Sequence, residues 1–523
     1  MGASVIVVGA GPVGLMLAGE LRLGGVDVVV YEQRAAPTGE SRGIGFTARA
    51  AEVFNQRGLL PRFGTVEKGQ EGHFGGVRID FGMLEDNHYG VRAVPQYRVE
   101  QGLEAWARQL GAPIRRGYTV VDVRQTADGV VAVVDGPDGR VEDTADYLVG
   151  CDGGRSVVRD RTGIDFPGTD ATRGMYLADI VGADIRQRYI GERVPNGMVM
   201  SARLEGGIDR ITIHEDGAPP PGRSTPTFEE LADTWLRLTG ESIHGGQARW
   251  VSAFTDATRQ AAEYRRGRVF LAGDAAHIHL PAGAQGLSVG VQDAVNLGWK
   301  LVATLKGWAP EGLLDTYHTE RHPVGARVLR NTRAQGIIYL SGEEIEPLRS
   351  VLRELVTLPD AARHLAGMVS GLDIRYDVGA AGDPLLGARM PDRELRLPDG
   401  DRVRIAQLQH RGRGLLISPP ESAGVREQAA AWSDRLDIVT ASRVADPAAG
   451  GPAGPESVLI RPDGYVIWVA PGDGELVAAL HRWFGAPRPV GGVPARDADR
   501  DDVAAPAALV GGGARGGEPR HRQ

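Results

Sequence analysis

The sequence predicts an α/β fold in which a parallel sheet is followed by an antiparallel layer and then by a smaller α/β domain. Residues 1–34 alternate short β-branched runs with a helical pattern, which is typical of a βαβ unit. Residues from about 172 to 262 read as short alternating strands, which favours an antiparallel sheet. The composition shifts again near Pro384, where a new series of strands and turns ends in a helical segment.

Length and composition are those of an ordinary globular protein. The 523 residues are enough for two or three domains, and 42% of them are hydrophobic. The net charge of −8 gives no reason to expect nucleic acid or an anionic membrane as a partner. Because Cys151 is the only cysteine in the sequence, intrachain disulfides and CxxC redox or zinc sites are excluded.

The first βαβ unit has strands at Val5–Val8 and Val26–Tyr31, joined by a helix over Val13–Leu23. Both strands are β-branched runs bounded by glycine, as expected for buried parallel strands. The uncharged run Val5–Gly19 is shorter than the roughly 20 residues that span a membrane. No basic segment precedes that run, which argues against a secretion signal and predicts a cytoplasmic protein.

Further elements follow from the hydrophobic spacing. Helices are expected at Ala48–Arg57, Val99–Leu110, Gly312–Thr332 and Glu343–Leu355, and strands at Tyr118–Arg124, Val130–Val134 and Tyr147–Val149. Few large apolar residues occur beyond about Gly491, which predicts a disordered tail. The expected domains are one domain in two parts, 1–171 and 263–380, a sheet domain at 172–262, a small domain at 381–490 and a tail at 491–523.

Residues 9–14 match the G-x-G-x-x-G motif directly after the first strand. Gly9 permits a tight turn, Gly11 lets the backbone approach a pyrophosphate, and Gly14 packs the helix on the strand. The helix begins with Pro12 and Val13, and its N-terminus attracts phosphate because its first N–H groups are unpaired. The motif therefore predicts a nucleotide-binding turn, with an ordinary glycine turn as the alternative.

Two polar residues follow at the end of the second strand. Glu32 is placed to accept hydrogen bonds from an adenosine ribose, and Arg34 is placed to flank the adenosine. Free ribose hydroxyls at this position favour FAD or NAD over NADP. For each of the two residues the alternative is a solvated surface side chain.

The strand Arg268–Asp274 and the residues after it distinguish FAD from NAD, because a flavin also needs a partner for its ribityl chain. Asp274 ends this strand and can accept a hydrogen bond from a ribityl hydroxyl. Its alternative role is to cap the turn at Ala275–His277.

The loop Pro281–Leu287 offers backbone N–H groups to a flavin ring, and Gly283 and Gly286 allow a close approach. A helix beginning near Leu287 or Ser288 would point its positive end at the reduced, anionic ring. The stretch as a whole therefore predicts FAD.

A similar arrangement appears after the strand Tyr147–Val149, where Asp152 and Gly153 precede a short helix with Ser156 and Arg159. Arg159 could contact a pyrophosphate or hold Asp152 in place. The alternative is a capped helix start beside a surface arginine.

Together, the three motifs resemble the fingerprints of the class A FAD-dependent aromatic hydroxylases of the phenol-hydroxylase-like type. The segments GESRGIGFTARAAEVFNQRGLLPRFG and HFGGVRIDFG further resemble the aromatic polyketide hydroxylases, above all the angucycline hydroxylases. The resemblance extends from residue 2 to about residue 480. It implies a Rossmann-like FAD-binding domain, an antiparallel-sheet substrate domain and a thioredoxin-like C-terminal domain that lacks a cysteine pair.

The resemblance also implies roles for individual residues. Arg42 matches an arginine that reaches the FAD pyrophosphate, and Gln96 matches a glutamine near the ribityl chain and ring. Val120 matches a residue whose backbone meets the adenine, and Pro281 matches a proline beside the isoalloxazine.

The implied function is hydroxylation of a polycyclic aromatic polyketide in antibiotic biosynthesis. FAD would be tightly but non-covalently bound, with NAD(P)H as a transient co-substrate and O2 as the oxidant. No catalytic side chain is assigned, because the flavin carries the difficult chemistry. The alternatives are epoxidation, Baeyer–Villiger oxidation, drug inactivation, or a flavin-binding partner protein without turnover.

Two histidines and three tryptophans could be mistaken for metal ligands or cofactor contacts. His277 and His279 alternate like a metal-binding pair, but no further ligands accompany them, so we expect no metal site. Trp235, Trp250 and Trp299 are expected to be core residues rather than stacking partners of a cofactor.

Overall fold

The computed structural model describes residues 3–41, 43–65, 68–84, 86–220, 226–443, 457–471 and 475–488. The α/β prediction is confirmed. The first sheet has the strand order β19-β20-β11-β1-β2-β7. Strands β20, β11, β1 and β2 run parallel, and β19 joins one edge antiparallel. Their bounds are β1 Val5–Val8, β2 Val28–Glu32, β7 Ile114–Arg116, β11 Tyr147–Gly150, β19 Arg265–Arg266 and β20 Val269–Leu271.

Helix α1 (Pro12–Leu23) packs between α3 (Gln96–Gln109) and α6 (Gln285–Leu305) against this sheet. A side chain at Gly19 would come within 2.0 Å of the Trp106 ring, so this glycine lets α3 approach α1 closely. Helix α6 is buried over almost its whole length. It is therefore a central element, which the rest of the chain surrounds.

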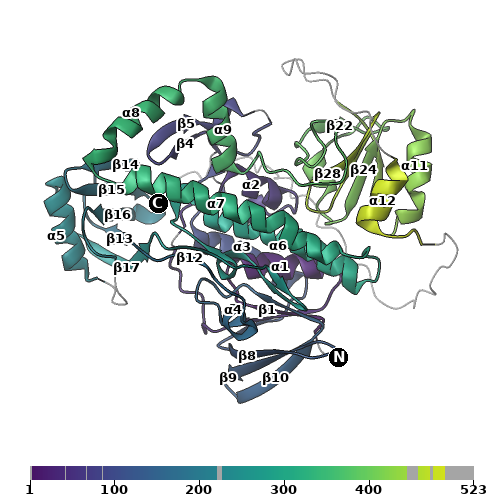
Figure 1. Cartoon of the computed structure of the whole chain (residues 1–523), viewed down its shortest axis with the longest axis horizontal. Helices are drawn as coiled ribbons and strands as arrows, with labels where there is room; N and C mark the ends of the chain where they lie inside the picture. The colour runs from purple at the N-terminus through teal and green to yellow at the C-terminus, as the bar shows by residue number, and fades with distance from the viewer. Residues whose placement is uncertain are drawn as a thin grey trace, which may run out of the picture. The chain divides into compact units, whose positions relative to one another are not determined.

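The predicted antiparallel layer is a sheet of strand order β14-β15-β16-β13-β17. Figure 1 shows α5 (Phe228–Thr239) beside this sheet, and its Trp235 is fully buried in the core between them. The sequence interpretation expected strands here and missed α5, although its capping box of Thr227 and Glu230 is a start signal. The strands are β13 Gly174–Val181, β14 Arg188–Val194, β15 Gly197–Arg203, β16 Asp209–Glu215 and β17 Gln247–Thr255.

Smaller sheets complete this part of the chain. A meander has the order β10-β9-β8, with β8 Thr119–Gln125, β9 Val130–Gly136 and β10 Gly139–Ala145. Short pairings add β3 Lys68–Gly69 with β6 Val91–Arg92, β4 Glu71–Phe74 with β5 Val77–Asp80, and β12 Gly168–Thr169, β18 Thr258–Gln260 and β21 His277–Ile278 in one sheet.

The remaining helices of this region are α2 Ala48–Asn55, α4 Val157–Thr162, α7 Thr316–Leu340, α8 Glu346–Leu355 and α9 Pro359–Ser370. Helix α7 packs against α6 and runs eight residues past the predicted end at Thr332. The sequence interpretation missed α9, whose pattern of small residues is weak. In the part of the chain that the structure describes, no helix is long and apolar enough to cross a membrane.

The C-terminal domain is built on a sheet of order β25-β24-β27-β28, in which β24 and β25 are parallel and the other pairs antiparallel. This is the strand arrangement of the thioredoxin-like fold, as predicted. A second sheet has the order β23-β22-β26. The elements are β22 Glu394–Arg396, β23 Arg402–Arg404, α10 Ile405–Leu408, β24 Gly414–Ser418, α11 Ala423–Ala429, β25 Leu436–Thr440, β26 Ser442–Arg443, β27 Ser457–Ile460, β28 Val466–Ala470 and α12 Leu476–Phe484.

The turn between β27 and β28, residues 461–464, inserts among helices of the first domain. Arg461 is fully buried and donates bidentately to Glu320 of α7, at 2.6 and 2.9 Å. Asp463 accepts a hydrogen bond from Asn296 of α6 at 3.1 Å. Lys300, one turn along α6, completes the cluster with a 2.8 Å ion pair to Glu320. The two domains therefore share one buried ionic cluster.

The expected tail at 491–523 lies outside the described residues. The domain boundaries given above stay predictions.

Candidate functional site

Four polar loops lie at one edge of the parallel sheet, because each follows the carboxyl end of a neighbouring strand. The glycine motif follows β1, and Glu32 ends β2 beside it. Asp152 follows β11, which pairs with β1 on its other side, and Asp274 follows β20, the next strand. The carboxyl edge of an open parallel sheet is where such folds bind their ligands.

The glycine motif is shaped by close backbone contacts. Gly9 has a φ of +104°, and a side chain there would come within 2.4 Å of the Cys151 carbonyl oxygen. A side chain at Gly14 would come within 2.0 Å of the Gly9 carbonyl oxygen. At Gly11, by contrast, the added carbon would meet nothing within 4 Å. Gly9 and Gly14 thus serve the fold, whereas Gly11 borders open space.

The N-terminus of α1 faces that open space without a competing anion. Pro12 is its first residue, no side chain caps it, and its first turn carries no acidic residue. The unpaired N–H groups, beginning at Val13, are therefore available to a negatively charged group.

Glu32 is half-buried and is tied to the same turn. One carboxylate oxygen accepts from the Ala10 N–H and the other from the Arg34 N–H, both at 2.9 Å. Each oxygen has room for a further donor. Arg34 itself is exposed. Contact of either side chain with an adenosine stays a prediction.

Asp152 and Arg159 form a more local arrangement than predicted. Asp152 accepts from the Val158 N–H at 3.1 Å, and burial raises the pKa of its carboxyl group. Arg159 donates to the Gly154 carbonyl and to the Ala275 carbonyl, each at 3.0 Å. Arg159 therefore ties the Asp152 loop to the Asp274 loop, a role that the sequence interpretation did not consider.

Asp274 is exposed, and among the described residues nothing donates a hydrogen bond to its carboxylate. The alternative role as a cap of the following turn is therefore not observed. A side chain at the preceding residue, Gly273, would come within 2.8 Å of Val13, so this loop lies directly against α1.

The second glycine loop leads into α6, which begins at Gln285, slightly before the predicted start near Leu287 or Ser288. Gly283 and Ala284 both have left-handed backbones, with φ values of +69° and +55°. Such a turn directs successive N–H groups to one side and favours anions. Pro281 is exposed at the start of the loop.

Gly286 and Leu287 are the second and third residues of α6, and both are half-buried. An added carbon at Gly286 would make only an ordinary contact, 3.6 Å from His279. The fold therefore does not itself require glycine at position 286.

The residues implied by resemblance alone are placed as follows. The Gln96 N–H donates to Ser41 Oγ at 2.6 Å, so the start of α3 holds Ser41. The Gln96 side chain donates to Glu100 at 2.8 Å. Val120 is buried in β8. Arg42 lies outside the described residues.

Comparison with known proteins places this site in a family. Residues 2–332 match the model of a FAD binding domain, and residues 383–487 match the model of the C-terminal part of aromatic-ring hydroxylases. The chain belongs to the FAD-binding aromatic-ring hydroxylase family. The predicted resemblance and the predicted cofactor are thereby confirmed.

Individual relatives of this hydroxylase cover almost all of its length. CabE, an aromatic hydroxylase from angucycline biosynthesis of known crystal structure, is 58% identical with a TM-score of 0.90, covering 93% of this chain and 100% of CabE. A 12-dehydrotetracycline 5-monooxygenase/anhydrotetracycline 6-monooxygenase of Streptomyces rimosus is 43% identical over 92% of this chain and 99% of its own. A rifampicin monooxygenase of Streptomyces venezuelae is 44% identical over 92% and 98%.

The residues of this hydroxylase fit FAD. A diphosphate and a polyol chain require open space at Gly11, an uncapped α1 N-terminus and a carboxylate such as that of Asp274, to which no described residue donates.

A buried network under the Asp274 loop of the hydroxylase was missed in the sequence. Asp293 of α6 accepts from the Gly273 N–H at 3.1 Å, from His277 at 2.8 Å and from Arg321 at 2.7 Å. Burial alone would raise the pKa of the Asp293 carboxyl, but Arg321 and His277 more than offset it and hold that pKa below its usual value. A carboxylate inside the apolar helix pattern of Val289–Leu301 was the available signal.

The remaining expectations concern His277 and the tryptophans. His277 bonds Asp293 through Nε2, so it has a role in the network of the hydroxylase. Trp235 and Trp299 are buried in hydrophobic cores, as expected, whereas Trp250 is half-buried and donates to Asp179 at 2.8 Å.

Replacing Asp274 with alanine should weaken FAD binding by roughly 10–150-fold, because a hydrogen bond to a charged group contributes about 1.5–3 kcal/mol. The change should leave the melting temperature of the apoprotein unaltered, since no described residue donates to this carboxylate. Titration of apoprotein with FAD, followed by flavin fluorescence, measures the affinity. Asp128→Ala, at another exposed aspartate, is the control, and unchanged affinity in Asp274→Ala would contradict the assignment.

Proposed function

We propose that this hydroxylase uses NAD(P)H and O2 to hydroxylate a polycyclic aromatic polyketide in antibiotic biosynthesis. In the balanced reaction, NAD(P)H supplies an electron pair, one oxygen atom of O2 enters an aromatic C–H bond, and the other leaves as water. The named relatives, from angucycline and tetracycline chemistry, support this substrate class. The use of NAD(P)H agrees with the cytoplasmic location expected from the sequence.

The observation that carries the proposal is an apolar wall, defined as the buried hydrophobic cluster that the antiparallel sheet forms with the loop before α6. Met175 and Met198 of the antiparallel sheet pack with Leu280 and Ala282 of this loop in one buried cluster. Methionine side chains are flexible and adapt their shape to varied apolar partners. The cluster also includes Leu340, with Met200, Phe254 and Tyr339 packed against it.

One polar side chain near this wall is uncharged. His73 lies on β4, which packs against the Ala282–Ala284 turn, and its ring stacks on Tyr339 at a centroid distance of 5.6 Å. Burial lowers the pKa of His73 to about 4, so the ring is neutral at pH 7. An uncharged polar group beside an apolar wall suits a phenolic or quinoid ligand better than an ionic one.

The chain's own residues position the reactants rather than carry out the oxidation. When bound, FAD supplies the electron transfer and the activation of O2. The α1 N-terminus would hold the diphosphate, Glu32 the ribose and Asp274 the ribityl chain. The turn before α6 would stabilise the negative charge of the reduced ring. The apolar wall would orient the aromatic ring and exclude water.

The direct test is to incubate the holoprotein with NADPH or NADH, ¹⁸O2 and a panel of angular and linear tetracyclic polyketides. We expect a product that gains one labelled oxygen as an aromatic hydroxyl, identified by mass spectrometry and NMR. An epoxide, a ring-expanded lactone or a modified rifamycin would instead support the oxygenations of drug-modifying relatives. If no compound increases NAD(P)H consumption, a flavin-binding protein without turnover is favoured.

Bound flavin should be reduced faster when an aromatic polyketide occupies the site. A flavin reduced without substrate would waste reductant on O2, so occupancy is expected to control reduction. Anaerobic stopped-flow mixing with NAD(P)H, with and without a polyketide, measures the reduction rate directly. A maximal rate without any ligand would contradict this control while leaving the hydroxylation itself untouched.

A further inference from the structure

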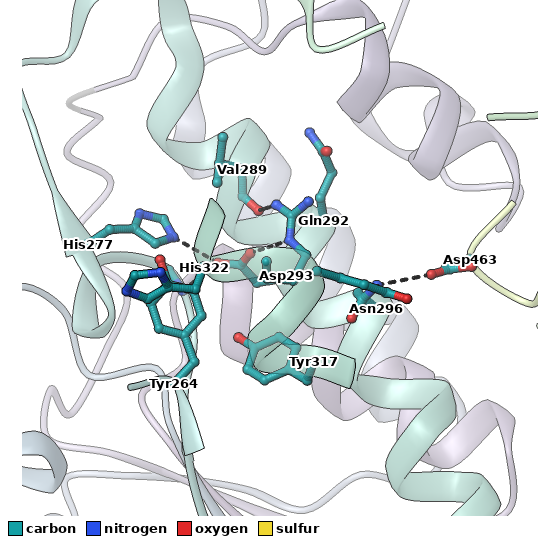
Figure 2. Close-up of polar contacts among 12 residues, drawn as sticks. Tyr264, His277, Val289, Gln292, Asp293, Asn296, Tyr317, His322 and Asp463 are labelled. Atoms are coloured by element: carbon teal, nitrogen blue, oxygen red, sulfur yellow. Dashed lines mark hydrogen bonds and ion pairs between the residues drawn. The ribbon is translucent and has the colours of Figure 1, made fainter. Parts of the chain in front are cut away.

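The loop that carries Asp274 is hydrogen-bonded to a buried carboxylate, that of Asp293. Figure 2 shows Asp293 on α6 pointing toward His277, with Tyr264 and Tyr317 close by. Oδ2 of Asp293 accepts from the Gly273 N–H at 3.1 Å and bonds His277 Nε2 at 2.8 Å. The two contacts lie on either side of Asp274 in the sequence. Asp293 therefore brackets the exposed aspartate.

The other oxygen of Asp293 is fixed by α7. Arg321 Nε donates to Oδ1 at 2.7 Å, and the same guanidinium donates to the Val289 carbonyl at 3.1 Å and to the Tyr376 hydroxyl at 2.8 Å. Asp293 and Arg321 are both at most 1% exposed. The Asp293 carboxylate is thus immobilised. Through its bonds to Gly273 and His277 it also fixes the position of the loop.

Asp274 depends on this support, because among the described residues it receives no hydrogen bond of its own. Gly273 has a φ of +62°, a left-handed conformation in which the chain turns just before Asp274. The Gly273 N–H bond and the His277 bond are the polar restraints that Asp293 places on this turn. Loosening them would let the Asp274 carboxylate move relative to α1.

We propose that Asp293 is a positioning residue for FAD, holding the Gly273–His277 loop so that Asp274 meets the ribityl chain. The inference rests on the proposed role of Asp274 at the flavin. It assigns to Asp293 an effect on cofactor affinity that exceeds its effect on folding. Asp293 is not expected to touch FAD itself.

A carboxylate is needed at position 293 because its three partners, the Gly273 N–H, His277 Nε2 and Arg321 Nε, all act as hydrogen-bond donors to it. An amide of the same shape has one acceptor oxygen and one NH2 group. In either orientation of Asp293→Asn, the NH2 group would face the Gly273 N–H or the Arg321 Nε–H, two donors that it cannot satisfy. The substitution therefore loses either a bond to the loop or the Arg321 bond that fixes residue 293, without changing side-chain volume.

The chain offers a matched control in the Lys300–Glu320 pair. Like Asp293 and Arg321, these residues join α6 to α7, at 2.8 Å, and both side chains are buried. Burial lowers the pKa of Lys300 to about 8, so it remains mostly charged at pH 7. Lys300 contacts Asn296 and Glu320 and does not reach the Gly273–His277 loop. Lys300→Met therefore removes a buried ion pair between the same helices but leaves the loop intact.

The experiment measures two quantities for Asp293→Asn, Lys300→Met and Asp274→Ala in the full-length chain. FAD affinity comes from fluorescence titration of the apoprotein, and stability comes from its melting temperature. The visible circular dichroism of the bound flavin reports the geometry of the site. We expect Asp293→Asn to weaken FAD binding about tenfold or more, the scale of losing hydrogen bonds to a charged group, and to alter the dichroism. Lys300→Met should destabilise the apoprotein yet keep near-wild-type affinity.

Equal losses of affinity in Asp293→Asn and Lys300→Met, in proportion to lost stability, would overturn the proposal and make Asp293 a helix-packing residue. Wild-type affinity in Asp274→Ala would overturn it differently, by removing the contact on which it rests. If Asp293→Asn does not fold, His277→Leu takes its place, because it removes one loop bond and keeps the Asp293–Arg321 pair. Unchanged affinity and dichroism in His277→Leu would then count against the proposal.

Discussion

Replacing Arg461 with methionine should lower the free energy of unfolding by about 3–5 kcal/mol, the cost of breaking a buried ion pair from one side. Arg461 is fully buried: it bonds Glu320 and Asp463, and its guanidinium carbon lies 4.5 Å from the centroid of the Trp483 ring. Methionine would fill much of the volume but leave both carboxylates short of a donor. Chemical denaturation of the holoprotein measures the change.

An exposed arginine of the same domain provides the comparison. Arg402 pairs with Glu394 at 2.7 Å, but its side chain is 57% exposed. Arg402→Met should change stability by less than about 1 kcal/mol, as for other surface pairs. Similar changes in the free energy of unfolding for the two substitutions would show that the buried cluster stabilises the protein no more than a surface ion pair does.

Exchanging Gly11 and Gly14 for alanine, one at a time, should separate cofactor binding from folding. Gly11→Ala adds a methyl group to open space at a φ of −77°, which alanine adopts freely, so the apoprotein should keep its stability. The methyl group would occupy the space predicted for the pyrophosphate. If the clash costs about 1–3 kcal/mol, as overpacking does, FAD affinity should fall roughly 5–150-fold.

Gly14→Ala should act on the fold first. Its methyl carbon would come within 2.0 Å of the Gly9 carbonyl oxygen, so α1 must move away from the sheet. We expect a loss of about 1–3 kcal/mol or more in the free energy of unfolding, with reduced FAD uptake as a consequence. Melting temperatures of the two apoproteins test the contrast, and a stability loss in Gly11→Ala equal to that in Gly14→Ala would refute it.

The motif loops could be placed from sequence because local rules govern them. A β-branched run followed by glycines predicts a parallel strand and its carboxyl-end loop, and such loops meet at one sheet edge. Gly9, Asp152 and Asp274 were located in this way. Their adjacency follows from strand order rather than from any contact between the residues in sequence.

The supporting residues could not be found in this way, because their partners are distant in the chain. Asp293 and Arg321 are 28 residues apart, and Arg461 reaches Glu320 across 141. No spacing rule connects such pairs, and a charged residue on a helix is ordinarily read as solvent-facing. The predicted start of α6, near Leu287 or Ser288, lies after the observed start at Gln285. The left-handed residue before the helix is Ala284, where glycine would be the usual signal.

The turn at residues 461–464 also orders events during synthesis of the chain. Glu320 leaves the ribosome 141 residues before its partner Arg461. At a synthesis rate of about 5–20 residues per second, Arg461 is added roughly 7–30 s after Glu320. Until then, the nucleotide-binding half can form its sheet and its own Lys300–Glu320 pair, but the buried cluster between α6 and α7 lacks Arg461 and Asp463. A premature stop before residue 461 would therefore leave a nearly complete polypeptide without a finished core, and proteolysis rather than partial activity is its expected fate.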